Sequence, residues 1–193
     1  MTGSAAGLVI RRYASTDEPS WLRCRALGFL DSAYFDDVRR SRRQYAAPDD
    51  DLRGWVACVG EEVIALLDVE VDGLEATIDT VATHPDHRGR GLATALLAEA
   101  VAELRAAGVA VLDAWTRDDP PALGWYAARG FVEEQHYLHV YAGDGDDLTG
   151  FGQPAQLSAP VRTFHHARLE DEEWARARFA RVHVCRRCVL TLD

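Results

Sequence analysis

The sequence contains no lysine, and its 21 basic residues are all arginine. This absence excludes a P-loop, because that nucleotide-binding turn ends in a Lys-Ser or Lys-Thr pair. The exclusive use of arginine is typical of a GC-rich bacterial genome, and we expect a bacterial source.

Long hydrophobic runs are also missing. No apolar segment approaches the roughly 20 residues that a transmembrane helix needs. Residues 1–7 lack the basic start and long apolar stretch of a secretory leader. We therefore expect a cytoplasmic protein without a membrane partner. With 48% hydrophobic and 27% charged residues over 193 positions, the chain suits one globular domain with a real core.

The sequence has fewer basic than acidic residues, 21 against 31, which gives a formal net charge of -10. An acidic balance argues against nucleic acids and anionic membrane surfaces as main partners. It is compatible with a cationic ligand such as a protonated amine. An acidic surface that serves only solubility explains it as well.

Cysteine is scarce, and the four that occur do not form a framework. Cys185 and Cys188 have Cys-x-x-Cys spacing, but no second pair completes a zinc site. Residues three apart in a strand also point to opposite faces, which prevents chelation. The histidine pairs lack acidic or sulfur neighbours in a metal pattern. We expect structural thiols and no metal site.

The most informative stretch that is present runs from His84 to Leu97. Gly89 and Gly91 form a tight turn directly before an amphipathic helix, whose apolar residues recur every three or four positions up to Leu104. Gly108 supplies the expected stop. Two glycines let a ligand approach the backbone, and the first helical turn leaves its N–H groups unpaired. This pattern predicts a seat for phosphate.

The phosphate is not that of a dinucleotide, because the Gly-x-Gly-x-x-Gly fingerprint lacks its third glycine here. The stretch from Arg88 to Ala93, Arg-Gly-Arg-Gly-Leu-Ala, resembles the Arg/Gln-x-x-Gly-x-Gly/Ala signature of the GNAT superfamily of acyl-CoA-dependent N-acyltransferases. A second block resembles the same family: Tyr126 ends a short helix four residues before the Gly130-Phe131 pair. The two blocks and the elements between them span residues 76–131.

The resemblance implies an α/β (α+β) fold, a mixed, centrally splayed sheet of about seven strands with helices on both faces. We expect one domain over residues 1–193. Its last part, 143–193, would be a long loop followed by a helix and a strand. The insertion at 143–182 either determines acceptor specificity or elaborates the surface. The residues predict these elements: strands at 8–13, 55–59, 63–71, 76–83, 109–115, 133–141 and 182–192, helices at 15–29, 32–44, 92–107, 122–129 and 167–178, and a loop at 47–51.

The helix expected at 32–44 has a defined orientation. Tyr34, Phe35 and Val38 would face inward, and an arginine cluster (Arg39, Arg40, Arg42, Arg43) would face outward.

By the same resemblance the cosubstrate is acetyl-CoA or a close acyl-CoA, with no metal. Its pyrophosphate would sit on the amides after Arg88, and its pantetheine arm would lie along the strand that ends at Thr83. The cofactor-binding residues expected from the resemblance are Val81, Ala82, Thr83, Arg88, Gly89, Arg90, Gly91, Leu92, Ala93, Thr94, Asp119 and Tyr126.

The resemblance also implies the chemistry, a direct attack of a neutral amine on the thioester within a ternary complex. Tyr126 matches the family's general acid, and a phenol suits protonation of a departing thiolate. Packing against the cofactor is its other interpretation. Asp119 stands where the family often has Asn, so helix capping competes with a cofactor contact.

The position of the general base departs from the family pattern. Many family members place Glu where this chain has Thr77, which cannot serve. Asp79 lies on the same strand face and is the candidate, with Asp68 and Glu70 as further candidates. A solvated or ion-paired carboxylate is the competing interpretation of each.

The leading hypothesis is thus an N-acetyltransferase for a primary amine of a small, cationic molecule. A peptide or protein N-terminus or side chain is the rival acceptor. A non-catalytic acyl-CoA-binding sensor and a generic nucleotide-binding protein are rivals of other classes. Family resemblance also makes a homodimer an option.

Overall fold

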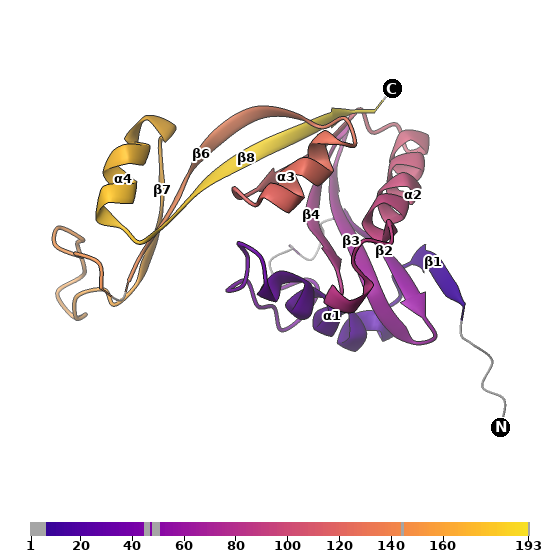
Figure 1. The fold of residues 1–193 in the computed structure, drawn as a ribbon, viewed down its shortest axis with the longest axis horizontal. Coiled ribbons are helices and arrows are strands. Elements are labelled where there is room, and N and C mark those ends of the chain that lie inside the picture. The colour runs from indigo at the N-terminus through magenta and orange to yellow at the C-terminus, as the bar shows by residue number, and fades with distance from the viewer. Residues whose placement is uncertain (1–6, 45–46, 48–50, 144, 193) are drawn as a thin grey trace. The chain divides into compact units, whose positions relative to one another are not determined.

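The computed structural model describes residues 7–44, 47, 51–143 and 145–192. Its strands join in the order β1-β2-β3-β4-β5-β8-β6-β7 as one mixed, mostly antiparallel open sheet (Figure 1). This confirms the expected fold class. The strands are β1 (Leu8–Arg12), β2 (Asp51–Val59), β3 (Glu62–Asp72), β4 (Glu75–Thr83), β5 (Val111–Thr116), β6 (Val132–Ala142), β7 (Thr163–Ala167) and β8 (Arg181–Thr191). The α-helices are α1 (Glu18–Leu30), α2 (Leu92–Ala106), α3 (Pro120–Ala127) and α4 (Glu172–Arg178).

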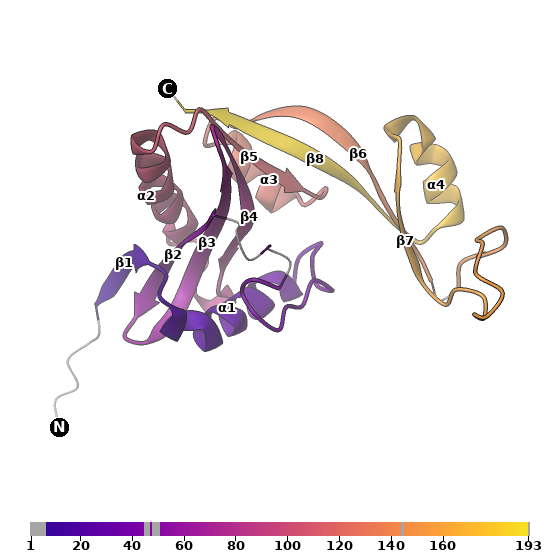
Figure 2. The same cartoon turned by 180° about the vertical axis from the view of Figure 1, so that it is seen from behind.

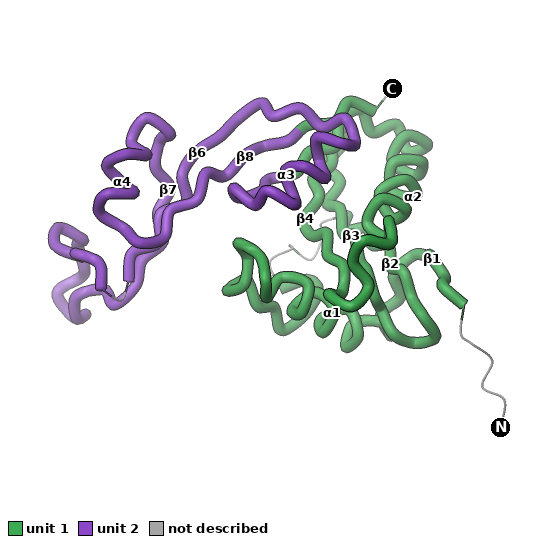
Figure 3. Tube along the Cα trace, viewed as in Figure 1, with its two compact units in different colours: residues 1–114, 189–193 green, residues 115–188 purple. Residues whose placement is uncertain are grey.

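The chain divides into two compact units (Figure 3). The first comprises residues 1–114 and 189–193, and the second comprises residues 115–188. The prediction of one domain over residues 1–193 stays a prediction. None of the helices within the described residues is long and apolar enough to cross a membrane.

In the first unit α1 packs on one face of the strands. Trp21 and Cys24 of α1 form a buried cluster with Val56, Leu66 and Ala82 of three successive strands. Full burial of a side chain such as Val56 or Leu66 contributes about 1.5–3 kcal/mol through removal from water. This cluster fixes α1 against β4, the strand that leads into the glycine turn.

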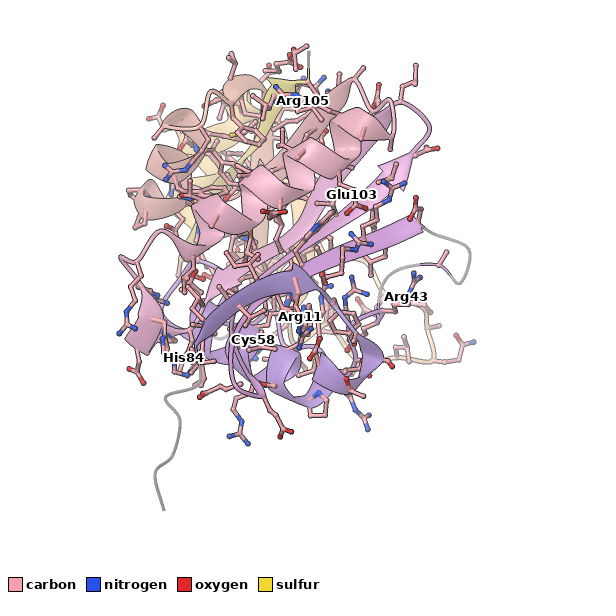
Figure 4. The ribbon with its side chains drawn as sticks, turned by 90° about the vertical axis from the view of Figure 1, so that its right-hand side faces the viewer. Arg11, Arg43, Cys58, His84, Glu103 and Arg105 are labelled. Carbon is pink, nitrogen blue, oxygen red and sulfur yellow. The ribbon has the colours of Figure 1, made fainter. Side chains whose placement is uncertain are left out.

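The other face of the same strands carries α2 (Figure 2). Side chains alternate along a strand, so Trp55 points away from the face that Val56 shares with α1. Arg12 lies over the Trp55 ring at 4.4 Å and pairs with Glu103 of α2 at 3.3 Å. Figure 4 shows Glu103 on the side of α2 that faces the strands. Helices therefore cover both faces, as expected.

The predicted helix at 32–44 is wrong. Residues 31–44 form turns and irregular backbone. Tyr34 is partly buried and Arg40 and Arg43 are exposed, as expected, but the burial of the other four residues is the reverse of the expectation. Phe35 and Val38 are 52% and 64% exposed, whereas the side chains of Arg39 and Arg42 are 7% and 8% exposed. The cause is that both arginines pair with aspartates of distant strands, which pulls the segment inward by its charged residues. The loop predicted at 47–51 lies mostly outside the described residues.

In the second unit α4 packs on β6 and β8. Leu138, Val140, Val182 and Val184 form a buried cluster with Phe179, just beyond α4. The sheet has eight strands rather than about seven, because residues 163–167 pair with β6 as the added strand β7. The helix expected at 167–178 is shorter and begins at Glu172.

Candidate functional site

The turn between β4 and α2 has the geometry expected of an anion seat. Gly89 and Gly91 both have φ of +74°, a left-handed conformation that only glycine adopts without strain. Gly91 caps α2, and its carbonyl accepts the first helical hydrogen bond, from Ala95 N at 3.0 Å. The amides of the first turn therefore precede the helical ladder and have no partner within it. A Cβ on either glycine would meet no atom within 4 Å, so the space over the turn is open.

Two arginines flank this turn and donate to backbone carbonyls, and Arg88 also lies 3.9 Å from the Asp31 carboxylate. Arg88 donates to the Gly28 carbonyl at 2.9 Å, and Arg90 donates to the Asp86 carbonyl at 3.3 Å. Both residues are exposed. Their charges add to the positive end of the α2 dipole, so the turn fits a phosphate or diphosphate.

The C-terminal half of β4 offers backbone groups beside this turn. His84 N donates to the opposite residue Ile64 at 2.9 Å, and bonded pairs alternate along antiparallel strands. Val81 and Thr83 therefore direct their N–H and C=O groups away from β3. On that other side, β4 pairs with β5 only through Glu75–Ile78 within the first unit. An extended ligand could pair with the free half of the edge.

β4 contains a β-bulge at Asp79. The register pairs Asp68 with Thr80 but Val69 with Ile78, so Asp79 is the extra residue. Its two oxygens accept from the Arg39 guanidinium at 2.7 and 2.9 Å. The Thr80 hydroxyl donates to the same carboxylate at 2.9 Å. Asp79, the predicted base, is thus fully engaged by donors.

Asp68 lies beside it and is sealed from solvent at 0% exposure. Arg42 binds both of its oxygens at 2.9 and 3.0 Å. Burial raises the pKa of Asp68 to about 6 against the opposing attraction of Arg42. Glu70, the third candidate, lies further along β3, opposite Thr77 and among the acidic residues Asp51, Asp72 and Glu75.

In the second unit, α3 carries the predicted acid. Asp119 caps the helix by accepting from Ala122 N at 3.2 Å, as its capping interpretation requires. Tyr126 lies near the end of α3 at 5% exposure. Its ring packs edge-on against Trp125 and Phe131, with centroids 5.0 and 5.1 Å apart. Phe131 of the Gly130-Phe131 pair thereby supports the Tyr126 ring.

The second unit also contains a pair that the sequence did not reveal. His183 of β8 and Asp118, just before α3, lie with Nδ1 and Oδ1 2.7 Å apart. They are 65 residues apart in the chain, and no motif or spacing connects them. Only the placement of β8 identifies the pair.

Among the residues that the structure describes, no group of three or more His, Cys, Asp or Glu side chains is suited to a metal ion. Cys185 and Cys188 are both buried as free thiols. Burial raises the pKa of each thiol, so neither presents a thiolate ligand at neutral pH.

Comparison with known proteins gives a consistent result. The model of the acetyltransferase (GNAT) family matches residues 17–131, which include the glycine turn and Tyr126. None of the curated proteins searched matches the chain. The likeness to solved structures is extensive, with 276 matching chains.

Three structures illustrate the likeness. The ribosomal-protein-S18-alanine N-acetyltransferase from Escherichia coli has a TM-score of 0.61 at 18% identity, over 97% of this chain and 95% of that one. A probable acetyltransferase from Staphylococcus epidermidis has a TM-score of 0.63 at 10% identity, over 97% and 100%. The PaiA N-acetyltransferase from Thermoplasma acidophilum, in complex with coenzyme A, has a TM-score of 0.57 at 12% identity, over 84% and 99%. At these identities the likeness shows a common fold.

Proposed function

Because the chain belongs to the acetyltransferase (GNAT) family and is an acetyl-CoA-dependent acyltransferase, we propose that it acetylates a primary amine of a small, cationic molecule. The observation that carries this proposal is the glycine turn at the start of α2, which lies within the family match and has open space over Gly89 and Gly91. The net charge of -10 supports a cationic acceptor, because it attracts protonated amines.

The turn residues supply the diphosphate site in this proposal. The amides of Gly89, Gly91, Leu92, Ala93 and Thr94 donate to the diphosphate oxygens. Arg88 and Arg90 add charge, and each can exchange a neutral carbonyl partner for a phosphate.

The pantetheine arm pairs with the free edge of β4 in this proposal. Val81 and Thr83 turn their backbone groups to that edge, and Ala82 holds the strand against β3 and α1. A backbone N–H at this edge stabilises the oxyanion that forms when the thioester is attacked.

Tyr126 is the proposed general acid. Its hydroxyl gives a proton to the departing thiolate, and the contacts with Trp125 and Phe131 fix the ring for this transfer. Asp119 begins the helix that carries Tyr126, and its predicted contact with the cofactor stays a prediction. The cytoplasmic location and the pairing of two copies likewise stay predictions.

The alternative acceptor is a peptide or protein amine. It is favoured by the likeness to the S18-alanine N-acetyltransferase, which covers nearly all of both chains. A sensor that binds acyl-CoA without turnover is the second alternative. Two departures from the family pattern motivate this alternative: Thr77 stands where many members have Glu, and Asp119 stands where the family often has Asn.

A thiol-release assay with acetyl-CoA separates these functions. The panel should contain a polyamine, an aminoglycoside, free amino acids and a peptide with an unblocked N-terminus. Release of coenzyme A with a small amine supports the proposal. Release with the peptide alone identifies a peptide or protein amine as the acceptor instead. Calorimetric binding of acetyl-CoA without release for any amine identifies the sensor. Thermal shifts with ATP or NAD that exceed those with coenzyme A point to a nucleotide-binding protein.

A further inference from the structure

Side chains from two other parts of the first unit hold the bulge of β4. Arg39, in the segment after α1, binds both oxygens of Asp79 at 2.7 and 2.9 Å. The Thr80 hydroxyl donates to the same carboxylate at 2.9 Å and accepts from Arg25 Nε of α1 at 3.5 Å. Arg25 in turn donates to the Asp37 carboxylate at 2.7 Å. The bulge is thus tied both to α1 and to the segment that follows it.

These contacts are shielded from water. The side chains of Arg39 and Asp79 are 7% and 17% exposed, and Thr80 is buried. Burial lowers the pKa of Arg39, but the hydrogen bond with Asp79 and the charge of that carboxylate outweigh burial and raise the pKa. The guanidinium therefore stays charged. Hydrogen bonds between charged groups are strong in such surroundings, so the two-point fork fixes the Asp79 side chain.

The bulge determines which backbone groups of β4 reach the free edge of the strand. Asp79 is the extra residue between Ile78 and Thr80, which both pair with β3. One extra residue inverts the alternation of backbone groups along a strand. Val81 is therefore the first residue beyond the bulge that turns its N–H away from β3. A shift in the bulge would move this N–H directly.

We propose that Arg39 is a positioning residue for acyl transfer: through Asp79 it holds the bulge so that the Val81 N–H points at the thioester oxygen. This inference rests on the proposed function, in which the thioester lies along this edge. The neutral amine attacks the carbonyl carbon, a C–N bond forms, and the C=O electron pair moves to oxygen. When the C=O bond forms again, the C–S bond breaks and sulfur leaves with its electron pair. The nitrogen loses one proton and the thiolate gains one.

Arg39 also neutralises a charge that would oppose this reaction. Asp79 and Val81 are two residues apart in one strand, about 6.6 Å by the rise of a β-strand. A carboxylate without its cation at this distance would destabilise the oxyanion, because like charges repel more strongly in a shielded site. The fork therefore aligns the amide and removes the repulsion of the Asp79 charge.

This arrangement gives Asp79 a role other than that of the predicted base. A base must reach its proton directly or through one water. Arg39 and Thr80 occupy the carboxylate with three donors, so it serves to hold the bulge. The two roles differ in one measurable respect. A residue that positions the Val81 amide alters the bound thioester before any amine is present, whereas a base does not.

The test observes the thioester carbonyl without an acceptor. Acetyl-CoA isotopically labelled at its thioester carbonyl carbon is bound to the protein, and the carbon NMR resonance is compared with that of free acetyl-CoA. A hydrogen bond to the carbonyl oxygen withdraws electron density from the carbon, so the wild-type resonance should move downfield on binding. In Arg39→Met this displacement should shrink, while calorimetry should show that acetyl-CoA still binds.

Kinetics give the second readout, with an amine that the wild type acetylates. The kcat of Arg39→Met should fall by about 100-fold, typical of a misplaced or lost oxyanion donor, with little change in KM for acetyl-CoA. Arg39→Lys keeps the charge but cannot form the two-point fork. It should recover only part of the carbonyl displacement and part of kcat.

Arg11→Met is the matched control. Arg11 forms the same kind of fork with Asp17, at 2.7 and 2.8 Å, but it lies on β1, which β2 and β3 separate from β4. Loss of this fork should leave the carbonyl displacement and kcat unchanged. An equal loss in Arg11→Met would attribute the effect to stability and overturn the positioning role.

The outcomes separate this inference from the proposed function. If the wild type binds no acetyl-CoA or releases no coenzyme A with any amine, the proposed function fails and the inference fails with it. If the wild type turns over but its bound carbonyl resonates as in free acetyl-CoA, only the inference fails. It is also overturned if folded Arg39→Met keeps the wild-type displacement, whatever its kcat. If Arg39→Met does not fold by circular dichroism, Arg39→Lys decides, and wild-type values in that variant overturn the role equally.

Discussion

Arg39 holds Asp79 in a two-point ion pair, with nitrogen–oxygen distances of 2.7 and 2.9 Å. The pair joins the irregular segment after α1 to the bulge of β4, 40 residues further along the chain. Arg42 and Asp68 form a parallel link from the same segment to β3. The segment is therefore fixed by buried charges and not by an apolar helix face.

Asp79→Asn should destabilise the fold, because it leaves the buried Arg39 guanidinium without its anion. Removal of one partner of a buried pair costs about 3 kcal/mol in free energy of unfolding. Urea unfolding measures the change. Asp51→Asn is the matched control: its pair with Arg53 is exposed, with 52% of the Asp51 side chain in solvent, and its loss should cost below about 1 kcal/mol. Unchanged stability with a large loss of kcat would instead favour Asp79 as the base.

The sequence was sufficient where local chemistry decides the structure. The apolar spacing after Gly91 predicted α2, and Gly108 ended it within two residues of the observed boundary. The capping function of Asp119 also needs only the four residues that follow it. These features are visible because their partners are neighbours in the chain.

The sequence failed where partners are distant. Phe35 and Val38 have helical spacing, but their burial was decided by the aspartates that bind Arg39 and Arg42 from other strands. Nothing in the sequence around Asp68 or Asp79 identifies either residue as a partner of this segment. His183 was missed for the same reason, because its carboxylate lies 65 residues away.

Gly91→Ala should weaken coenzyme A binding. Alanine at φ of +74° costs about 1–2 kcal/mol, and the new methyl projects into the open space over the amides. We expect at least a tenfold rise in the dissociation constant by calorimetry, equivalent to about 1.4 kcal/mol. Gly73→Ala is matched in strain, because Gly73 has φ of +59° with open space around it, but it lies in the β3–β4 hairpin. Equal weakening by both variants would refute the diphosphate seat.

His139 should make the protein sensitive to mild acid. Burial lowers its pKa to about 4 in the folded state, below the ordinary 6.5. As the pH falls from about 6.5 to about 4, the unfolded chain binds a proton that the folded chain does not, so the free energy of unfolding decreases in this window. His139→Gln should flatten the profile there, measured by urea unfolding at pH 7 and pH 5. His136→Gln, at an exposed site, should leave the slope unaltered; a flatter profile there would assign the effect elsewhere.

Tyr126→Phe should separate proton transfer from packing. The substitution removes only the hydroxyl and retains the edge-on contacts with Trp125 and Phe131. If the hydroxyl protonates the departing thiolate, kcat should fall by about 100-fold or more with acetyl-CoA binding unchanged. A thioester with a more acidic leaving thiol needs less protonation, so the defect should shrink with that substrate. Tyr137→Phe, on a ring that packs against Trp115 and His166, is the control for loss of a phenol in the same unit. If the Tyr126→Phe enzyme has a normal kcat, Tyr126 serves only in packing, because the variant keeps the ring contacts and lacks only the hydroxyl that would donate the proton.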